Sequence, residues 1–130
     1  YISGYTTGPL YGPQLGNRDL FVAKYSAAGD LLWGRQAGTT GHDQAWGVAT
    51  DAAGDVYVSG ETGGSLDGSV YYGDLDVFLT KYSPAGTRLW TAQMGTPNSD
   101  LADGVASPFR SDGLGGLPVY RRDPIAGDVL

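Results

Sequence analysis

A stretch of 21 residues, DLFVAKYSAAGDLLWGRQAGT at positions 19–39, recurs as DVFLTKYSPAGTRLWTAQMGT at positions 76–96. Twelve of the 21 aligned positions are identical, and each lies 57 residues after its partner. Upstream of this stretch, YISGYTTG at 1–8 matches YVSGETGG at 57–64 with an offset of 56. A chain with such a duplication is built from copies of one structural unit, so the unit determines the architecture.

The repeated unit has the signature of β-strands. Segments such as VYVSG and FVAKY are short and rich in β-branched and aromatic residues. The intervening DAAGDV, SAAGDL and SPAGTR each open on a polar residue and carry a glycine three positions later, which is typical of a type I turn followed by a left-handed glycine. No long stretch keeps a helical period of 3.6 residues. We therefore predict four antiparallel strands in the second unit, at 46–50, 56–60, 77–82 and 89–94.

Four antiparallel strands in a unit of this length fit a blade of a β-propeller. The sequence thus predicts an all-β chain with about two propeller-like blades. Residues 1–44 form a partial blade of three strands, 45–101 form a complete blade, and 102–130 hold the first strand of a further blade, near 104–107, followed by a divergent tail. Because a propeller needs roughly four to eight blades to close, the chain is expected to be a piece of a larger propeller or to be completed by other copies.

Taken together, the motifs of the repeat resemble the bacterial β-propeller repeats called SBBP repeats. The motifs that carry the resemblance are FVAKYSAAGDLLWGRQAGT and the DQAWGVATDAAGDVYVSG that follows it. The resemblance covers residues 1–107 in two registers. The chain departs from the family pattern at Asp55, where the family prefers asparagine. It departs again after Ser107, where PFRSDGLGGLPVYRRDPIAGDVL replaces the expected DAAGDVYVSG. The resemblance implies a propeller fold and an extracellular or cell-surface setting in bacteria, and it supplies no catalytic residues.

Composition excludes several classes of protein. The net charge is −6, from 8 basic and 14 acidic residues, and no basic stripe of the kind that nucleic-acid binders carry is present. Cysteine is absent, which excludes a disulfide framework and a cysteine-ligated zinc site. No run approaches the roughly 18 apolar residues of a membrane helix, so we expect no membrane insertion. The single histidine, His42, and the absence of a G-x-S-x-G motif favour a non-enzymatic protein, with a fragment of a secreted hydrolase as a further alternative.

Two pairs of polar residues are candidate metal ligands. Asn17 and Asp19 precede one repeated strand, and Asp74 and Asp76 precede its copy. Oxygen ligands at positions i and i+2 are typical of calcium loops, although no third ligand completes a known calcium motif here. Alternatively, these side chains cap backbone N–H groups of the loops. We expect no other cofactor.

The loops before these pairs differ between the two copies, whereas the strands agree, and binding residues often lie on such loops. They carry four tyrosines, which suit stacking on sugars or contacts with proteins, or which pack the loops down. These candidate binding residues are Tyr5, Tyr11, Tyr71 and Tyr72.

We expect a structural role with self-assembly, in which copies of the chain exchange a strand or blade and build a ring or a filament. Residues 104–107 of one copy would pair with the strand near 1–4 of the next, unless the two ends meet within one chain. Trp33 and Trp90 occupy equivalent positions, and both are expected to be largely buried between blades or sheets. The alternative function is a carbohydrate- or calcium-dependent adhesion module of a larger secreted surface protein.

Overall fold

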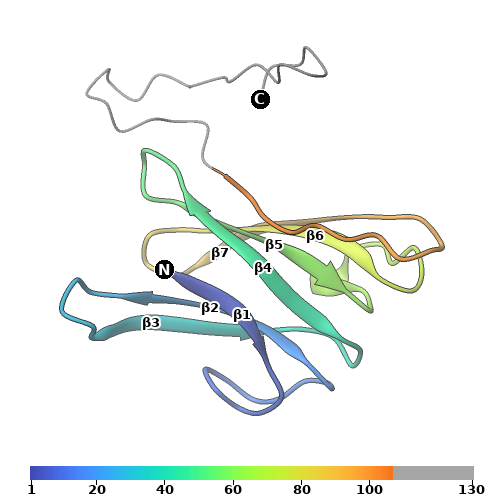
Figure 1. Cartoon of the computed structure of the whole chain (residues 1–130), viewed down its shortest axis with the longest axis horizontal. Coiled ribbons are helices and arrows are strands. Elements are labelled where there is room, and N and C mark those ends of the chain that lie inside the picture. Colours follow the sequence, from blue (N-terminus) through green and yellow to red (C-terminus); the bar gives the residue numbers. More distant parts are fainter. Residues whose placement is uncertain (107–130) are drawn as a thin grey trace.

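The computed structural model describes residues 1–106 and confirms an all-β chain with two antiparallel sheets (Figure 1). Each sheet is a meander whose neighbouring strands follow one another in sequence. The first sheet contains β1 (Ile2–Thr6), β2 (Asp19–Tyr25) and β3 (Leu31–Ala37). The second contains β4 (Asp43–Thr50), β5 (Val56–Thr62), β6 (Asp76–Tyr82) and β7 (Arg88–Met94), with a single 3-10 turn, η1 (Leu66–Gly68), between β5 and β6.

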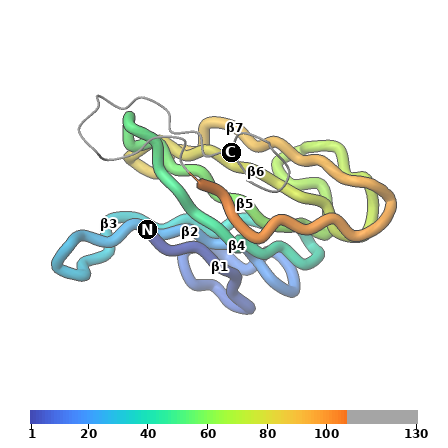
Figure 2. Tube along the Cα trace, turned by 45° about the horizontal axis from the view of Figure 1, so that its top comes forward, coloured from blue at the N-terminus to red at the C-terminus, as the bar shows by residue number. Residues whose placement is uncertain are grey.

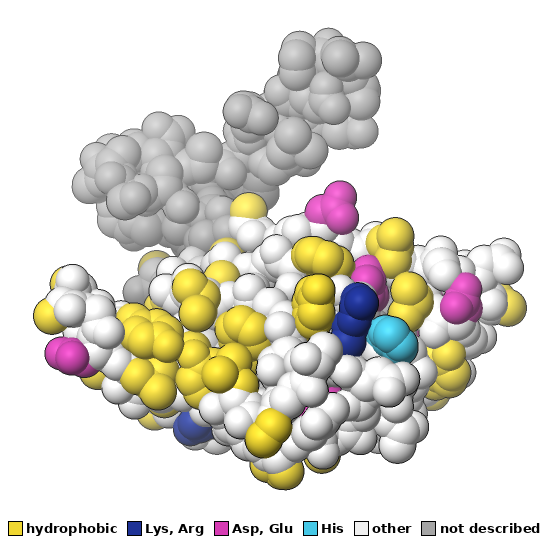
Figure 3. All heavy atoms as spheres, turned by 60° about the horizontal axis from the view of Figure 1, so that its bottom comes forward, with side chains coloured by type: hydrophobic (Ala, Val, Ile, Leu, Met, Phe, Trp, Pro, Cys, Tyr) yellow, Lys and Arg dark blue, Asp and Glu magenta, His cyan; other side chains and the backbone are white. Residues whose placement is uncertain are grey.

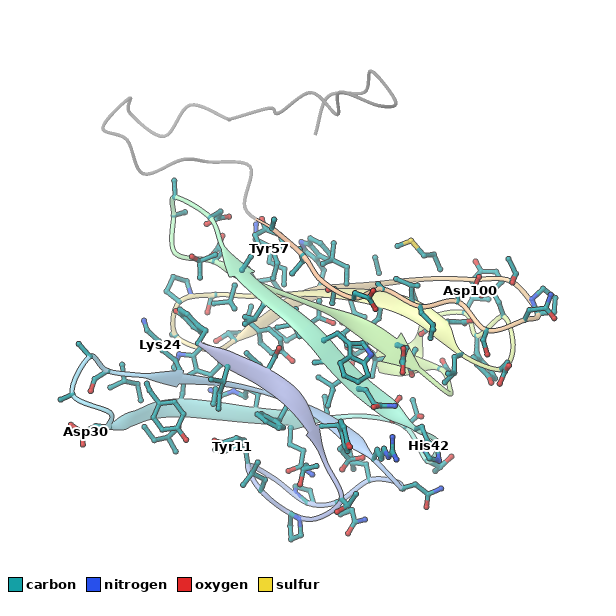
Figure 4. All side chains as sticks on the ribbon, viewed as in Figure 1. Tyr11, Lys24, Asp30, His42, Tyr57 and Asp100 are labelled. Carbon is teal, nitrogen blue, oxygen red and sulfur yellow. The ribbon has the colours of Figure 1, made fainter. Side chains whose placement is uncertain are left out.

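The three predicted tight turns are present, and they lie at one end of the sheets, which we call the turn end. Gly29, Gly54 and Gly86 have φ values of 89°, 84° and 84°, in the left-handed region that glycine adopts without strain. Each glycine N–H donates to the carbonyl oxygen three residues earlier, as in Gly29 to Ser26 at 2.9 Å. The longer connections β1–β2, β3–β4 and β5–β6 lie at the opposite, loop end, where His42 is found (Figure 4).

The core lies between the two sheets. Strand β4 lies against β1 and β2 of the first sheet without pairing with either (Figures 1 and 2). The side chains of β6 alternate between buried and partly buried positions, as expected of a strand with one face on a core. Both sheets and η1 contribute to the cluster of buried apolar residues at this core, which consists of Leu20, Val22, Ala45, Val56, Val58, Leu66, Phe78 and Tyr82.

The predicted strand at 104–107 is not formed over its described part, because residues 101–106 are in no strand; the rest of 102–130 lies outside the described residues. The segment nevertheless follows a defined path beside β4 (Figure 2). A Cβ atom on Gly47 would lie 2.6 Å from the Cα of Gly104, so the two backbones are in contact. Asp100 N–H donates to the Leu75 carbonyl at 2.7 Å, just as Asp43 N–H donates to the Arg18 carbonyl at 2.9 Å. The chain after Asp100 therefore starts from the second sheet as β4 starts from the first.

Candidate functional site

The two sheets contact one another at the turn end through side chains of β3. The Trp33 indole N–H donates to the Pro84 carbonyl at 3.0 Å, and Arg35 Nε donates to the Gly86 carbonyl at 2.8 Å. The Trp33 ring also lies 6.3 Å from the Tyr82 ring, between centroids. A Cβ atom on Gly86 would lie 2.7 Å from the indole, so only glycine permits this approach. The β6–β7 turn therefore forms a receptor surface for β3.

The equivalent surface of β7 is open. Trp90, the repeat partner of Trp33, is 42% exposed and has a single ring neighbour, Tyr57, at 6.3 Å. The prediction that both tryptophans are buried is therefore wrong for Trp90, and Trp33 is only partly buried. The reason is that a second sheet covers β3, whereas no further sheet covers β7 in the part of the chain that the structure describes. Leu89 and Met94 on the same strand are also exposed, so β7 presents an apolar surface.

The edge of the first sheet is also open, because β1 pairs only with β2 among residues 1–106. Its repeat equivalent in the second sheet, β5, pairs with β4 as well as with β6. A Cβ atom on Gly60 of β5 would lie 1.9 Å from the Gln44 carbonyl oxygen of β4, so the close pairing requires glycine there. The equivalent residue in β1 is Gly4, where a Cβ atom would meet only the Phe21 ring, at 3.1 Å. The first sheet thus has the glycine, but no strand in the described part of the chain pairs beside it as β4 pairs beside Gly60.

The repeated aspartates at the starts of β2 and β6 are buried and bind loop backbone. Asp19 is fully buried and accepts hydrogen bonds from the N–H groups of Leu15 (2.7 Å) and Gly16 (3.1 Å). Asp76, also fully buried, accepts from Tyr72 N–H at 2.8 Å. Both also accept from a glutamine amide, Gln36 or Gln93, at 2.9 Å. These contacts are those of loop-capping side chains.

The other members of the two pairs point elsewhere. Asn17 is exposed, and Asp74 is exposed with a carboxylate oxygen that accepts from the Ser99 hydroxyl at 2.5 Å. Asp76 Oδ1 is buried without a hydrogen-bond partner, but no group of three acidic or histidine side chains among residues 1–106 could hold a metal ion. The contacts therefore favour capping, and calcium binding by these pairs stays a prediction.

A second pair of repeated aspartates closes the β3–β4 connection and its copy. Asp43 is fully buried and accepts from Thr39 N–H at 2.6 Å and from the Thr62 hydroxyl at 2.5 Å. Asp100 accepts from Thr96 N–H at 2.7 Å and lies at the loop end, like His42 (Figure 4). Each loop therefore carries its own carboxylate cap.

The structure divides the four candidate tyrosines. Tyr11 lies flat on β3, because a Cβ atom on Gly34 would be 2.3 Å from its ring, and its hydroxyl bonds the Tyr25 hydroxyl at 2.8 Å. This hydrogen bond raises the pKa of Tyr11. Tyr5 is 42% exposed and lies under the Arg18 guanidinium at 4.7 Å. The exposed pair on the β5–β6 loop is Tyr71 and Tyr72, at 41% and 46%.

The loop end also holds His42, which is exposed, beside a cleft of about 340 Å³ whose other wall includes Asp74. The only glutamate of the chain, Glu61, is buried and accepts from the Gln44 amide at 3.2 Å. Figure 3 views the molecule from the side that is lowest in Figure 1, and it shows histidine, basic and acidic side chains together on one part of that face, while hydrophobic side chains gather on another part. No helix among residues 1–106 has the length and apolar character to cross a membrane.

The chain matches no protein-family model. It is similar to the regulatory protein FlaEY of Caulobacter vibrioides, with 32% identity over 78% of this chain. The chain spans only 11% of the length of that relative. The similarity therefore concerns a small part of a much longer protein.

Proposed function

We propose that the chain is a non-enzymatic structural module of the SBBP type, whose propeller-like blades assemble by exchanging a strand between copies. The observation that carries the proposal is that the first sheet has three strands where the repeat unit has four. The missing strand corresponds to β4, and its sequence recurs downstream as residues 100–107. An unpaired strand edge is a template for a strand from another chain.

The repeat supplies the register of this exchange. In the second sheet, Val48 of β4 lies opposite Val58 of β5, and Ala45 lies opposite Gly60. With offsets of 57 for the first strand and 56 for the second, the equivalent pairs are Val105 with Ile2 and Ala102 with Gly4 of the next copy. Gly4, which already faces the Phe21 ring, would then also face a close carbonyl, as Gly60 does.

The exposed face of β7 supports the same arrangement. With the next copy's first sheet in place, Trp90 would meet the turn at 26–29 of that copy, as Trp33 meets the β6–β7 turn within one chain. The indole N–H of Trp90 would donate to the Ala27 carbonyl, the repeat equivalent of Pro84. Each added copy would thereby cover the exposed Trp90 side chain of β7. Such head-to-tail contacts build a ring when the rotation closes and a filament when it does not.

A cross-linking experiment tests the proposed register, and the chain suits it because it has no cysteine. The double variant Ile2→Cys/Val105→Cys is expected to form a covalent ladder of copies on mild oxidation. The matched control, Ser3→Cys/Val105→Cys, moves one cysteine to the opposite face of β1 and should not cross-link. Cross-linked ladders of equal extent from both variants would refute strand exchange. An unaltered chain that stays monomeric, at 13.6 kDa, at all concentrations in sedimentation would refute it as well.

The proposed setting is extracellular or at the cell surface, as the resemblance to SBBP repeats implies. A second candidate function is carbohydrate binding by a module of a larger surface protein. Its support is the exposure of Tyr71 and Tyr72 on one loop, since exposed aromatic rings stack on sugars. Loss of glycan binding in a Tyr71→Ala/Tyr72→Ala variant that still assembles would separate this function from assembly.

A further inference from the structure

Two arginines converge on one cleft between the sheets at the turn end. Arg35 of β3 and Arg88 of β7 both line this space of about 340 Å³, together with Tyr82 and Thr87. A volume of this size accommodates a small molecule. Only five of the basic residues lie within residues 1–106, so two of the five face the same cleft.

The repeat does not require either arginine. The position equivalent to Arg35 in the second unit is Ala92, and the position equivalent to Arg88 in the first is Leu31. The strands otherwise agree closely between units. Both positions that differ from the repeat are therefore arginines, and they come from two different strands to the same cleft.

The donor groups in the cleft are only partly used. Arg35 donates Nε to the Gly86 carbonyl and Nη1 to the Gly34 carbonyl at 2.7 Å, which fixes the guanidinium and leaves Nη2. Neither ion pair among residues 1–106 includes Arg35. The Tyr82 hydroxyl has no hydrogen-bond partner among the described residues, although only 3% of this residue is exposed. The Tyr82 hydroxyl is protonated and able to donate near neutral pH, as in any tyrosine, and burial raises its pKa further, to about 12.

The charge balance of the cleft selects among anions. Arg88 pairs with Asp67, which also accepts from the Thr91 hydroxyl at 2.5 Å. With two guanidinium groups and one carboxylate, the local net charge is that of a single cation. This matches a monovalent carboxylate, which the planar guanidinium fork binds well, better than it matches a phosphate dianion. The Thr87 side chain, which lines the cleft, adds a polar group for neighbouring hydroxyls.

We propose that this inter-sheet cleft binds the carboxylate of a sugar acid, either free or as a residue of an acidic polysaccharide. Arg35 and the Tyr82 hydroxyl hold the carboxylate, and Arg88, which is paired with Asp67, lies on the opposite wall. The site is separate from the tyrosine loops and does not depend on assembly of copies.

Heteronuclear NMR titration tests the proposal on the full chain, with galacturonate as the probe and galactose as the neutral control. Galacturonate is expected to shift the amide signals of residues 35–37 and 86–88 in a saturable way, whereas galactose is not. Arg35→Gln should weaken binding by about tenfold or more, because it removes a charged hydrogen-bond donor. Lys24→Gln removes the same charge outside the cleft and should leave binding unchanged.

Two further arms keep the test decisive. Asp67→Asn keeps a side chain that tolerates the local φ of 53° and removes the acid, so it should strengthen binding of both galacturonate and inorganic phosphate. If Arg35→Gln unfolds below the assay temperature, the change in affinity of Asp67→Asn still tests whether the cleft binds the anion. The amide signals of residues 35–37 and 86–88 are compared in titrations with free galacturonate and with polygalacturonate. The ligand that shifts them identifies the source of the carboxylate. Equal binding of galactose, tighter binding of phosphate than of galacturonate by the unaltered chain, or no shift with either acid would overturn the proposal.

Discussion

The contact of Trp33 with the second sheet makes a quantitative prediction, because the repeat provides its own control. Trp33 and Trp90 are the same residue at equivalent positions, but only Trp33 reaches a neighbouring sheet. Replacing either by alanine removes the same atoms from the same kind of strand. The difference between the two costs in free energy of unfolding therefore measures the contact between sheets.

The expected magnitudes follow from the contacts. Truncation of a fully buried tryptophan costs about 3–5 kcal/mol, and a partly buried one costs about 2–3 kcal/mol. Loss of the hydrogen bond from the Trp33 indole to the Pro84 carbonyl adds about 1 kcal/mol. Each tryptophan also loses an edge-to-face ring contact, Trp33 with Tyr1 and Trp90 with Tyr57, and these two costs cancel in the difference. The contact of Trp33 with the Tyr82 ring has no counterpart and adds about 1 kcal/mol to the cost for Trp33. Trp33→Ala should thus destabilise the monomer by about 2 kcal/mol more than Trp90→Ala.

Urea unfolding followed by far-UV circular dichroism, at a concentration where the chain is monomeric, measures both costs by the same signal. Trp33→Ala is expected to lower the midpoint clearly, and Trp90→Ala only slightly. Equal destabilisation by the two variants would refute the reasoning, because it would mean that contacts within each sheet, rather than between sheets, dominate the contribution of these residues. Under assembling conditions Trp90→Ala should weaken association instead.

Other predictions concern assembly, metal and pH. Deletion of residues 102–130 should give a folded but non-assembling chain in sedimentation, and unchanged assembly would count against strand exchange. A chelator should leave the melting temperature unchanged, since the buried aspartates already accept loop N–H groups; a fall that calcium reverses would establish calcium binding instead. Because the pKa of Tyr82 rises from 10.0 to about 12 on folding, the protonated form is favoured in the native state, and stability should hold below pH 10 and decline between pH 10 and 12. Tyr82→Phe should reduce this decline relative to a control change at the exposed Tyr71, and an identical alkaline profile would contradict it.

Local patterns in the sequence predicted the parts of the fold that depend on neighbouring residues. The polar residue and glycine of each tight turn could be read directly, because a left-handed conformation leaves few alternatives to glycine. The strands followed from short runs of β-branched and aromatic residues. Strand β4 begins at Asp43, earlier than the predicted start at residue 46, because a register shift between Ala45 and Gly47 accommodates Trp46 within the strand.

Features that depend on how the sheets meet could not be predicted from these patterns. Arg35 and Arg88 are far apart in sequence, and only the packing of β3 against the β6–β7 turn brings them to one cleft. The exposure of Trp90 likewise depends on which surfaces have a neighbour, and the repeat gives both tryptophans the same local sequence. The sequence contains one indication of this cleft, since Arg35 and Arg88 both differ from the residues at the equivalent positions of the other repeat, Ala92 and Leu31.

The meander order of each sheet also bears on the sequence of events in folding. Every strand pair within a sheet joins chain segments that follow one another directly, so each sheet forms by closing short loops. The hydrogen bond from the Trp33 indole to the Pro84 carbonyl, in contrast, joins residues 51 positions apart and requires both sheets to be in place. Topology of this kind separates fast local steps from a slower docking step. We therefore expect the four-stranded sheet to form early and the three-stranded sheet to dock on it late, with Trp33 forming its contacts after the transition state of the second sheet.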